Sequence, residues 1–147
     1  MTTYVLKPKD AQERWHVVDA TGVALGRLAS DIAATLRGKK EPSFTPSADH
    51  RQYVVVINAA QVKVTGDLRE KKYYHHSMYP GGLKTVTQEK LLANKPELVV
   101  EKAVKGMLPH NSLGAQLLKH LKVYAGAEHP HAAQINAGKG KGRAASG

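Results

Sequence analysis

The fold is decided by one stretch near the middle of the chain, Tyr53-Val54-Val55-Val56-Ile57-Asn58. Its apolar residues favour extended backbone, and no polar residue alternates among them. Such a run is typical of a strand that is covered on both faces, as in the parallel sheets of α/β proteins. We therefore expect a central strand here, with helices above and below it.

The residues before this stretch predict a strand and a helix that lead into it. Residues 15–20 form the expected strand, which ends at the turn pair Thr21-Gly22. The helix should follow directly and stop at Gly38, because its apolar residues recur at the three-and-four spacing of one buried face. They are Leu25, Leu28, Ala29, Ile32, Ala33 and Leu36. A strand–helix–strand crossover of this kind is almost always right-handed and gives parallel strands.

The residues after the central stretch predict two short strands and three helices. Residues 62–66 alternate between apolar and polar and then turn, and residues 123–126 follow the last helix, so both indicate strands. The helices should begin at Thr87, at Pro96, and at Asn111 or Ser112. These residue types suit the first positions of a helix.

Length and composition limit the domain organisation and the class of protein. The 147 residues are enough for one domain that buries roughly two-thirds of the surface of its unfolded chain. The chain lacks cysteine and has no apolar run near Met1, so we expect no disulfide, no signal peptide and no membrane span. We divide it into an N-terminal extension (1–14), a single α/β domain (15–126) and a flexible basic C-terminal tail (127–147).

The net charge of +10 accumulates toward the C-terminus. Residues 1–50 carry 7 basic and 6 acidic side chains, residues 51–100 carry 8 and 4, and residues 101–147 carry 7 and 2. Clustered Lys and Arg gain free energy on nucleic acids by releasing counterions from the phosphates. A nucleic acid is therefore the expected partner, and a basic surface kept for solubility is the alternative.

Residues 71–84 hold the densest group of side chains suited to RNA. Their tyrosine and histidine rings can stack on unpaired bases, their lysines can meet phosphates, and Pro80-Gly81-Gly82 lets backbone approach a ligand closely. The alternative is a β-hairpin in which Tyr73 and Tyr74 are half-buried sheet residues. Residues 39–46, which begin with two lysines, either hold a phosphate backbone or form a solvated turn.

The sequence contains no recognisable catalytic centre. Residues 140–145 match the G-x-G-x-x-A dinucleotide fingerprint, which works only between a strand and a helix that are not expected there. The pairs His75-His76 and His129-Pro130-His131 lack the further ligand of a common metal set. No serine has the flanks of a nucleophile elbow. We therefore expect a non-enzymatic protein with no metal and no cofactor.

Several segments carry a family resemblance, of which the most specific are Tyr79-Pro80-Gly81-Gly82-Leu83-Lys84 and Gly106-Met107-Leu108-Pro109. The others are Leu25-Gly26-Arg27-Leu28-Ala29-Ser30, residues 54–59, Val64-Thr65-Gly66, residues 121–124 and His129-Pro130. In order and spacing, from about residue 15 to residue 134, they resemble bacterial ribosomal large-subunit protein thirteen. Two positions depart from that family. It usually has Gly-Asp where this chain has Arg51-Gln52, and a basic residue where this chain has Ala115, which removes one expected RNA contact.

The resemblance implies a three-layer α/β/α domain around a mostly parallel four-stranded sheet, with a basic hairpin or loop extension. It implies a cytoplasmic, structural constituent of the large ribosomal subunit, a ribonucleoprotein component of the translation machinery. Such a protein binds large-subunit rRNA, joins early in assembly and touches neighbouring ribosomal proteins, with no membrane and no small-molecule substrate. An RNA-processing or phosphoryl-transfer enzyme that uses the histidines, and a DNA-binding architectural protein, are the alternatives.

We expect three basic surfaces to contact the rRNA, chiefly by its shape. The first consists of Arg27, Arg37, Lys39 and Lys40. The second consists of Lys71, Lys72, Tyr73, His75, His76, Tyr79, Gly81, Gly82 and Lys84. The third consists of Lys105, His110, Asn111, Lys119 and Lys122, and the tail adds Lys139, Lys141 and Arg143.

Overall fold

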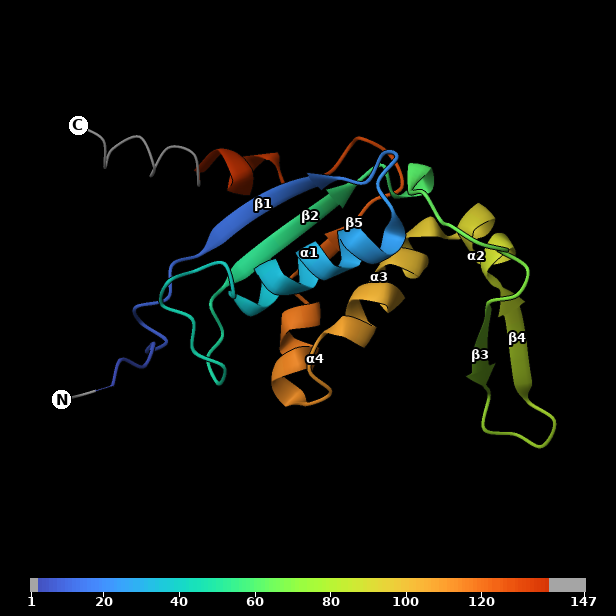
Figure 1. Ribbon diagram of the computed structural model, residues 1–147, viewed down its shortest axis with the longest axis horizontal. Helices are drawn as coiled ribbons and strands as arrows, with labels where there is room; N and C mark the ends of the chain where they lie inside the picture. Colours follow the sequence, from blue (N-terminus) through green and yellow to red (C-terminus); the bar gives the residue numbers. More distant parts are fainter. Residues whose placement is uncertain (1–2, 138–147) are drawn as a thin grey trace.

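A parallel sheet of three strands forms the centre of the protein in a computed structural model that describes residues 3–137. Its strands are β1 (Arg14–Asp19), β2 (Gln52–Ile57) and β5 (Leu121–Val123), with β2 in the middle (Figure 1). Tyr53 pairs with Trp15 on one side, and Val54 pairs with Leu121 on the other. The prediction that residues 53–58 form the central strand is confirmed.

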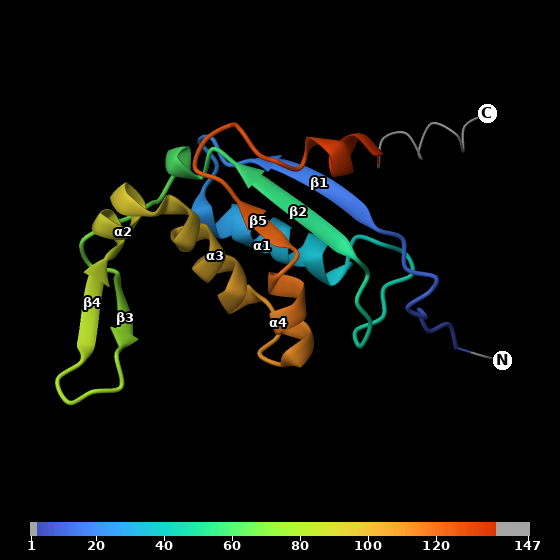
Figure 2. The same ribbon diagram turned by 180° about the vertical axis from the view of Figure 1, so that it is seen from behind.

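Helices cover one face of this sheet. They are α1 (Leu25–Arg37), which makes the crossover from β1 to β2, α3 (Pro96–Met107) and α4 (Ser112–Leu118), and both views show them on the same side (Figures 1 and 2). Val54 and Val56 of β2 join the apolar face of α1 in one buried cluster. No helix in residues 3–137 is long and apolar enough to cross a membrane.

The helix ends follow the signals in the sequence. Gly38 ends α1 with a φ of 80°, the left-handed conformation that glycine adopts at low cost. Thr87 caps α2 (Gln88–Asn94), since its hydroxyl accepts a hydrogen bond from the backbone N–H of Lys90. The Asn111 side chain caps α4 in the same way, accepting from the N–H of Gly114 at 2.9 Å. The predicted helix starts at Thr87, Pro96 and Asn111 are confirmed.

A two-stranded antiparallel hairpin extends from the helical side of the molecule, at the end opposite the N-terminal segment (Figures 1 and 2). It consists of β3 (Lys72–His76) and β4 (Leu83–Thr87), which leads directly into α2. The hairpin interpretation of residues 71–84 is therefore confirmed, and Tyr73 is half-buried while Tyr74 is exposed.

The expected strand at residues 62–66 is wrong, and with it the four-stranded parallel sheet. Only Lys63 pairs there, in a single bridge to Ala24, because a turn of 3-10 helix, η1 (Ala59–Gln61), follows β2 immediately. Gly66, with a φ of 90°, then turns the chain away from the sheet. Within residues 3–137 the parallel sheet has three strands.

The C-terminal segment covers only part of the second face of the sheet, where Val17 of β1 is 44% exposed. Within residues 3–137 no full layer of helices lies on this face, so the three-layer arrangement is not confirmed. Residues 132–137 are helical, and Ile135 is buried. The ring of His131 stacks on Trp15, with 5.3 Å between centroids, and its Nε2 lies 2.6 Å from the hydroxyl of Tyr124. The tail that was predicted from residue 127 therefore includes a helical turn at residues 132–137, in which Ile135 is buried.

Candidate nucleic-acid interface

The first predicted surface divides into two places on α1. Arg37, Lys39 and Lys40 lie together at the C-terminal end of the helix, whereas Arg27 lies in its first turn. Ten residues of helix rise about 15 Å, so Arg27 is not part of the same cluster. Lys40 is held 2.6 Å from Asp31, and it is the one predicted RNA-binding cation with an acidic partner within residues 3–137.

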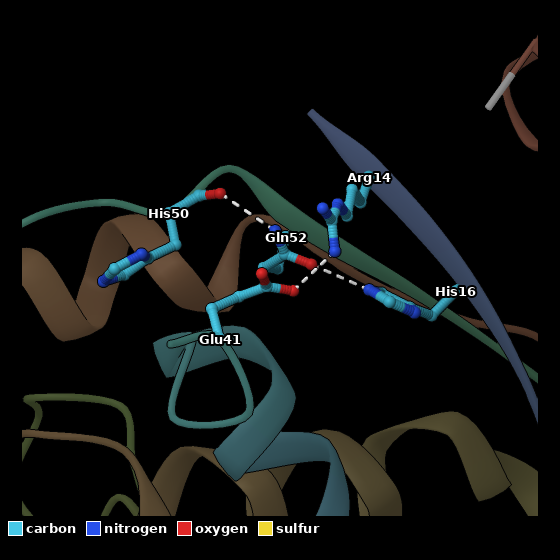
Figure 3. Close-up of polar contacts among 5 residues, drawn as sticks. All are labelled: Arg14, His16, Glu41, His50 and Gln52. Carbon is cyan, nitrogen blue, oxygen red and sulfur yellow. Dashed lines mark hydrogen bonds and ion pairs between the residues drawn. The ribbon is translucent and has the colours of Figure 1, made fainter. Parts of the chain in front are cut away.

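A network of polar contacts ties the loop that follows α1 to the sheet (Figure 3). Arg14 of β1 pairs with Glu41 at 2.8 Å, within the loop that also carries Lys39 and Lys40. The buried His50 packs so closely on Gly38 that a Cβ at Gly38 would overlap its imidazole ring. The lysines are thus presented from an anchored loop, and phosphate binding by them stays a prediction.

One departure from the family pattern lies at the start of β2. Arg51 has a φ of 52°, in the region that favours glycine, which accounts for the glycine usual in the family at this position. Gln52 is buried, and its side chain receives a hydrogen bond from His16 at 2.8 Å while donating to the carbonyl of His50 (Figure 3). Only the exposed Arg51 of this pair is available to a partner.

The second predicted surface coincides with the hairpin. Residues 71–88 contain three lysines and two histidines and no acidic residue. In an antiparallel pair, directly opposed residues share a face, so His75 and Lys84 lie side by side on one face. Tyr74 and Leu83, both well exposed, lie on the other face. The hairpin therefore combines cationic groups with exposed apolar ones.

Tyr73 marks the base of the hairpin and brings together groups from three segments. Lys71 Nζ lies 5.5 Å from the centre of its ring, and Lys102 Nζ of α3 lies 5.0 Å from it. The amide of Gln88 lies 3.4 Å from the Tyr73 hydroxyl. Lys102 was not among the predicted contacts, because nothing in the spacing of the sequence places α3 beside residue 73. Two ammonium groups beside one ring create a concentrated positive charge.

The third predicted surface surrounds a groove between α3 and α4. The groove has a volume of about 430 Å³ and is lined by Lys105, His110, Asn111 and Lys119 together with apolar residues. The oxygen of Asn111 is already occupied by its capping bond to Gly114, so this side chain has a structural role as well. A Cβ at Gly114 would overlap the Pro109 carbonyl, which fixes the shape of the connection.

The remaining predicted contacts do not join these surfaces. Lys122 pairs with Val55 on the second face of the sheet, next to the C-terminal segment and away from the groove. Burial of the His131 ring lowers the pKa of His131, and the positive charge of Lys122 lowers it further. Lys139, Lys141 and Arg143 lie outside the described residues.

An aromatic cluster occupies the second face of the sheet and was not foreseen. Tyr53 stacks on Trp15 at 4.5 Å between centroids and contacts His120 at 4.4 Å. Burial, with smaller contributions from Glu13 and Asp49, raises the pKa of Tyr53 above its usual value. These rings pack against one another, so we interpret the cluster as a contribution to the stability of the fold and not as a ligand site. Within residues 3–137 no three acidic or histidine side chains gather as a metal site would require.

Comparison with known proteins connects these surfaces to one family. The family model described as "Ribosomal protein L13" matches residues 13–130. "Large ribosomal subunit protein uL13" of Alteromonas mediterranea is 58% identical over 135 residues, which is 91% of this chain and 95% of the relative. The proteins of the same name from Symbiobacterium thermophilum and Brevibacillus brevis are 55% and 57% identical, over 90% of this chain and 93% and 92% of their own. All three basic surfaces lie within the matched residues.

Proposed function

The chain belongs to the ribosomal protein L13 family, and on that premise we propose that it is a structural constituent of the large ribosomal subunit. Members of this family are non-enzymatic components of the ribosome, and the large ribosomal subunit of bacteria lies in the cytoplasm. In that particle the chain binds large-subunit rRNA, takes part in early assembly and touches neighbouring ribosomal proteins.

The observation that carries this proposal is the family match together with three basic surfaces held apart on one α/β body. The loop after α1, the hairpin and the α3–α4 groove belong to different segments, each anchored to the same core. Lysines gain free energy on phosphates without reading base sequence, so surfaces of this kind recognise the relative positions of RNA backbones. The protein acts as a clamp that holds folded RNA segments in a fixed arrangement.

The core supplies the rigidity that such a clamp needs. Val54, Val55 and Val56 of β2 are fully buried, and Leu36 of α1 packs in the same interior. A strand covered in this way cannot itself touch RNA. Its contribution is to fix the distances between the loops that do.

Sedimentation of cell extract tests the proposal. A tagged chain should co-sediment with the large subunit in high-magnesium buffer and should already be present in precursor particles after a short pulse of labelling. A variant with Lys71, Lys72 and Lys84 replaced by Gln should be recovered in that fraction in a smaller amount. A full-length chain that stays at the top of the gradient would contradict the ribosomal role, and one that appears only in mature subunits would contradict early assembly.

A binding comparison at equal salt separates RNA from DNA. Purified protein should prefer large-subunit RNA to duplex DNA of equal length, because its surfaces are arranged for a folded RNA. Equal affinity for both would favour the architectural DNA-binding alternative.

A further inference from the structure

The tip of the hairpin has a single, well-defined backbone conformation. Tyr79-Pro80-Gly81-Gly82 forms a type II turn, closed by a 2.9 Å hydrogen bond from the Gly82 N–H to the Tyr79 carbonyl. Pro80 occupies the second position, and Gly81 has the positive φ of 70° that the third position requires. A second bond, from the Ser77 N–H to the Gly82 carbonyl at 3.0 Å, closes the loop at its base.

Gly82 leaves no room for any other residue. A Cβ at this position would overlap the Ser77 hydroxyl and would lie 2.8 Å from the Tyr79 carbonyl oxygen. The loop is therefore held together by its own backbone. The side chains at the tip of the loop are therefore held in a fixed position.

Met78 is the unusual residue of this tip. Its φ of 67° lies in the left-handed region, which a side chain with a Cβ adopts at a cost. The conformation is supported by a 2.9 Å hydrogen bond from the Met78 N–H to Nδ1 of His76. The strained backbone directs an apolar side chain into solvent, where Met78 is 88% exposed and the adjacent Tyr79 is 75% exposed.

The surroundings of these two side chains decide which partner they fit. No acidic residue occurs between residues 71 and 88, and the paired His75 and Lys84 lie on the strands next to the tip. Lys84 beside a thioether and a phenol ring, in a segment without acidic residues, complements an RNA backbone that flanks exposed bases. Apolar side chains inserted at a base step are a known way for proteins to open stacked bases, and aromatic rings stack on the bases so released.

We propose that Met78 and Tyr79 form an apolar wedge that enters an unstacked step of rRNA, with Tyr79 stacked on one base and Met78 filling the opened space. Lys84 holds a phosphate next to this step, with His75 directly opposite it on the same face of the hairpin. The wedge rests on the proposed function and deepens it, because it assigns the hairpin a partner of defined chemistry: unpaired bases rather than a regular duplex.

The test compares Met78→Gly with Met78→Leu in the full-length chain bound to large-subunit RNA. Glycine accepts the positive φ, so Met78→Gly keeps the turn and removes only the Met78 side chain, the part of the wedge that fills the opened space. Leucine keeps an apolar side chain at the same backbone strain and serves as the matched control. Base-reactive and backbone-cleaving probes applied to the same complexes report stacking and phosphate protection separately.

Wild type and Met78→Leu should produce the same local change in base reactivity, and Met78→Gly should lose it while the backbone footprint stays in place. Tyr79→Ala should weaken binding roughly five- to 150-fold, the range that corresponds to removing one aromatic ring from a stacked base. Identical base reactivity in Met78→Gly and wild type would overturn the wedge. In large-subunit particles purified from cells that carry Met78→Gly, loss of a neighbouring protein with RNA reactivity unchanged would overturn it in favour of a protein contact. Absence of any wild-type footprint on the RNA would instead refute the proposed function itself.

Discussion

The parallel sheet and the β3–β4 hairpin are both β-structure, yet they place their side chains in opposite surroundings. In β2 the three central valines are fully buried. In the hairpin every strand residue except Tyr73 and Thr87 is exposed. A two-stranded hairpin without a covered face is marginal in water by itself, so it depends on α2 and on the contacts at Tyr73.

This difference separates stability from recognition within one chain. The body buries the apolar surface that drives folding. The hairpin exposes groups that add little to the free energy of folding and would contribute to the free energy of binding. Substitutions in the two regions should therefore affect different measurements. Four experiments test whether the separation holds.

The largest expected effect is on the free energy of unfolding. The experiment compares one residue type, leucine, in the two regions. Leu36 of α1 is 0% exposed and Leu83 of β4 is 59% exposed. Leu36→Ala should lower the free energy of unfolding by about 2 to 5 kcal/mol, because it leaves a cavity in the core. Leu83→Ala should change it by about 0.5 kcal/mol or less. Urea denaturation followed by circular dichroism measures both, and similar losses for the two variants would show that the hairpin belongs to the cooperative core.

The next effect should appear in RNA binding and leave folding nearly untouched. Gly82→Ala places a methyl group against Ser77 and the Tyr79 carbonyl, so the tip must change shape. Affinity for large-subunit RNA, measured by filter binding, should fall about fivefold or more. A loss of about fivefold is the low end of the effect of removing one aromatic ring from a stacked base. The free energy of unfolding should change by less than about 1 kcal/mol. Gly26→Ala, where a Cβ meets nothing within 4 Å, is the matched control and should retain wild-type affinity.

The body of the protein was largely predictable because its signals are local. The valine run and the spacing of apolar residues in α1 report burial directly, and Thr87 and Asn111 cap helices with their own side chains. The error at residues 62–66 has a physical reason. Alternation describes any extended segment, and it does not say whether a neighbouring strand runs alongside for one residue or for five.

The candidate interface was predictable as a set of residue types and less so as a geometry. Lysines near tyrosines in residues 71–84 indicated a binding segment, but the approach of Lys102 to Tyr73 depends on how α3 packs. The separation of Arg27 from Arg37 could have been foreseen, because the predicted helix already had Arg27 near its start and Arg37 at its end. The stacking of His131 on Trp15 joins the two ends of the domain, and no local pattern encodes such a contact.

A smaller effect concerns the pH dependence of the body. Burial lowers the pKa of His131 in the folded chain below its usual 6.5, so the unfolded chain takes up a proton first as the pH falls. The contribution of His131 to stability is therefore present above pH 6.5 and is lost as the pH drops through the folded-state pKa. Denaturation midpoints measured between pH 7.5 and 5 should fall less steeply in His131→Asn than in wild type. His75→Gln, in the hairpin, should leave the wild-type profile in place, and a flattened profile in that variant would contradict the separation of the two regions.

The smallest effect compares one charge in each region through the salt dependence of binding. Lys84 lies in the hairpin, and no acidic residue occurs between positions 71 and 88. Lys40, beside α1, instead forms an exposed ion pair with Asp31 at 2.6 Å. Removing one lysine–phosphate interaction should reduce the slope of log affinity against log salt by about one. Lys84→Gln should show that full reduction with no change in stability. Lys40→Gln should show less, because its ammonium is partly neutralised before RNA arrives, and should cost at most about 1 kcal/mol in folding through the exposed ion pair. Titrations against large-subunit RNA at several salt concentrations give both slopes, and equal reductions would mean that Asp31 releases Lys40 on binding.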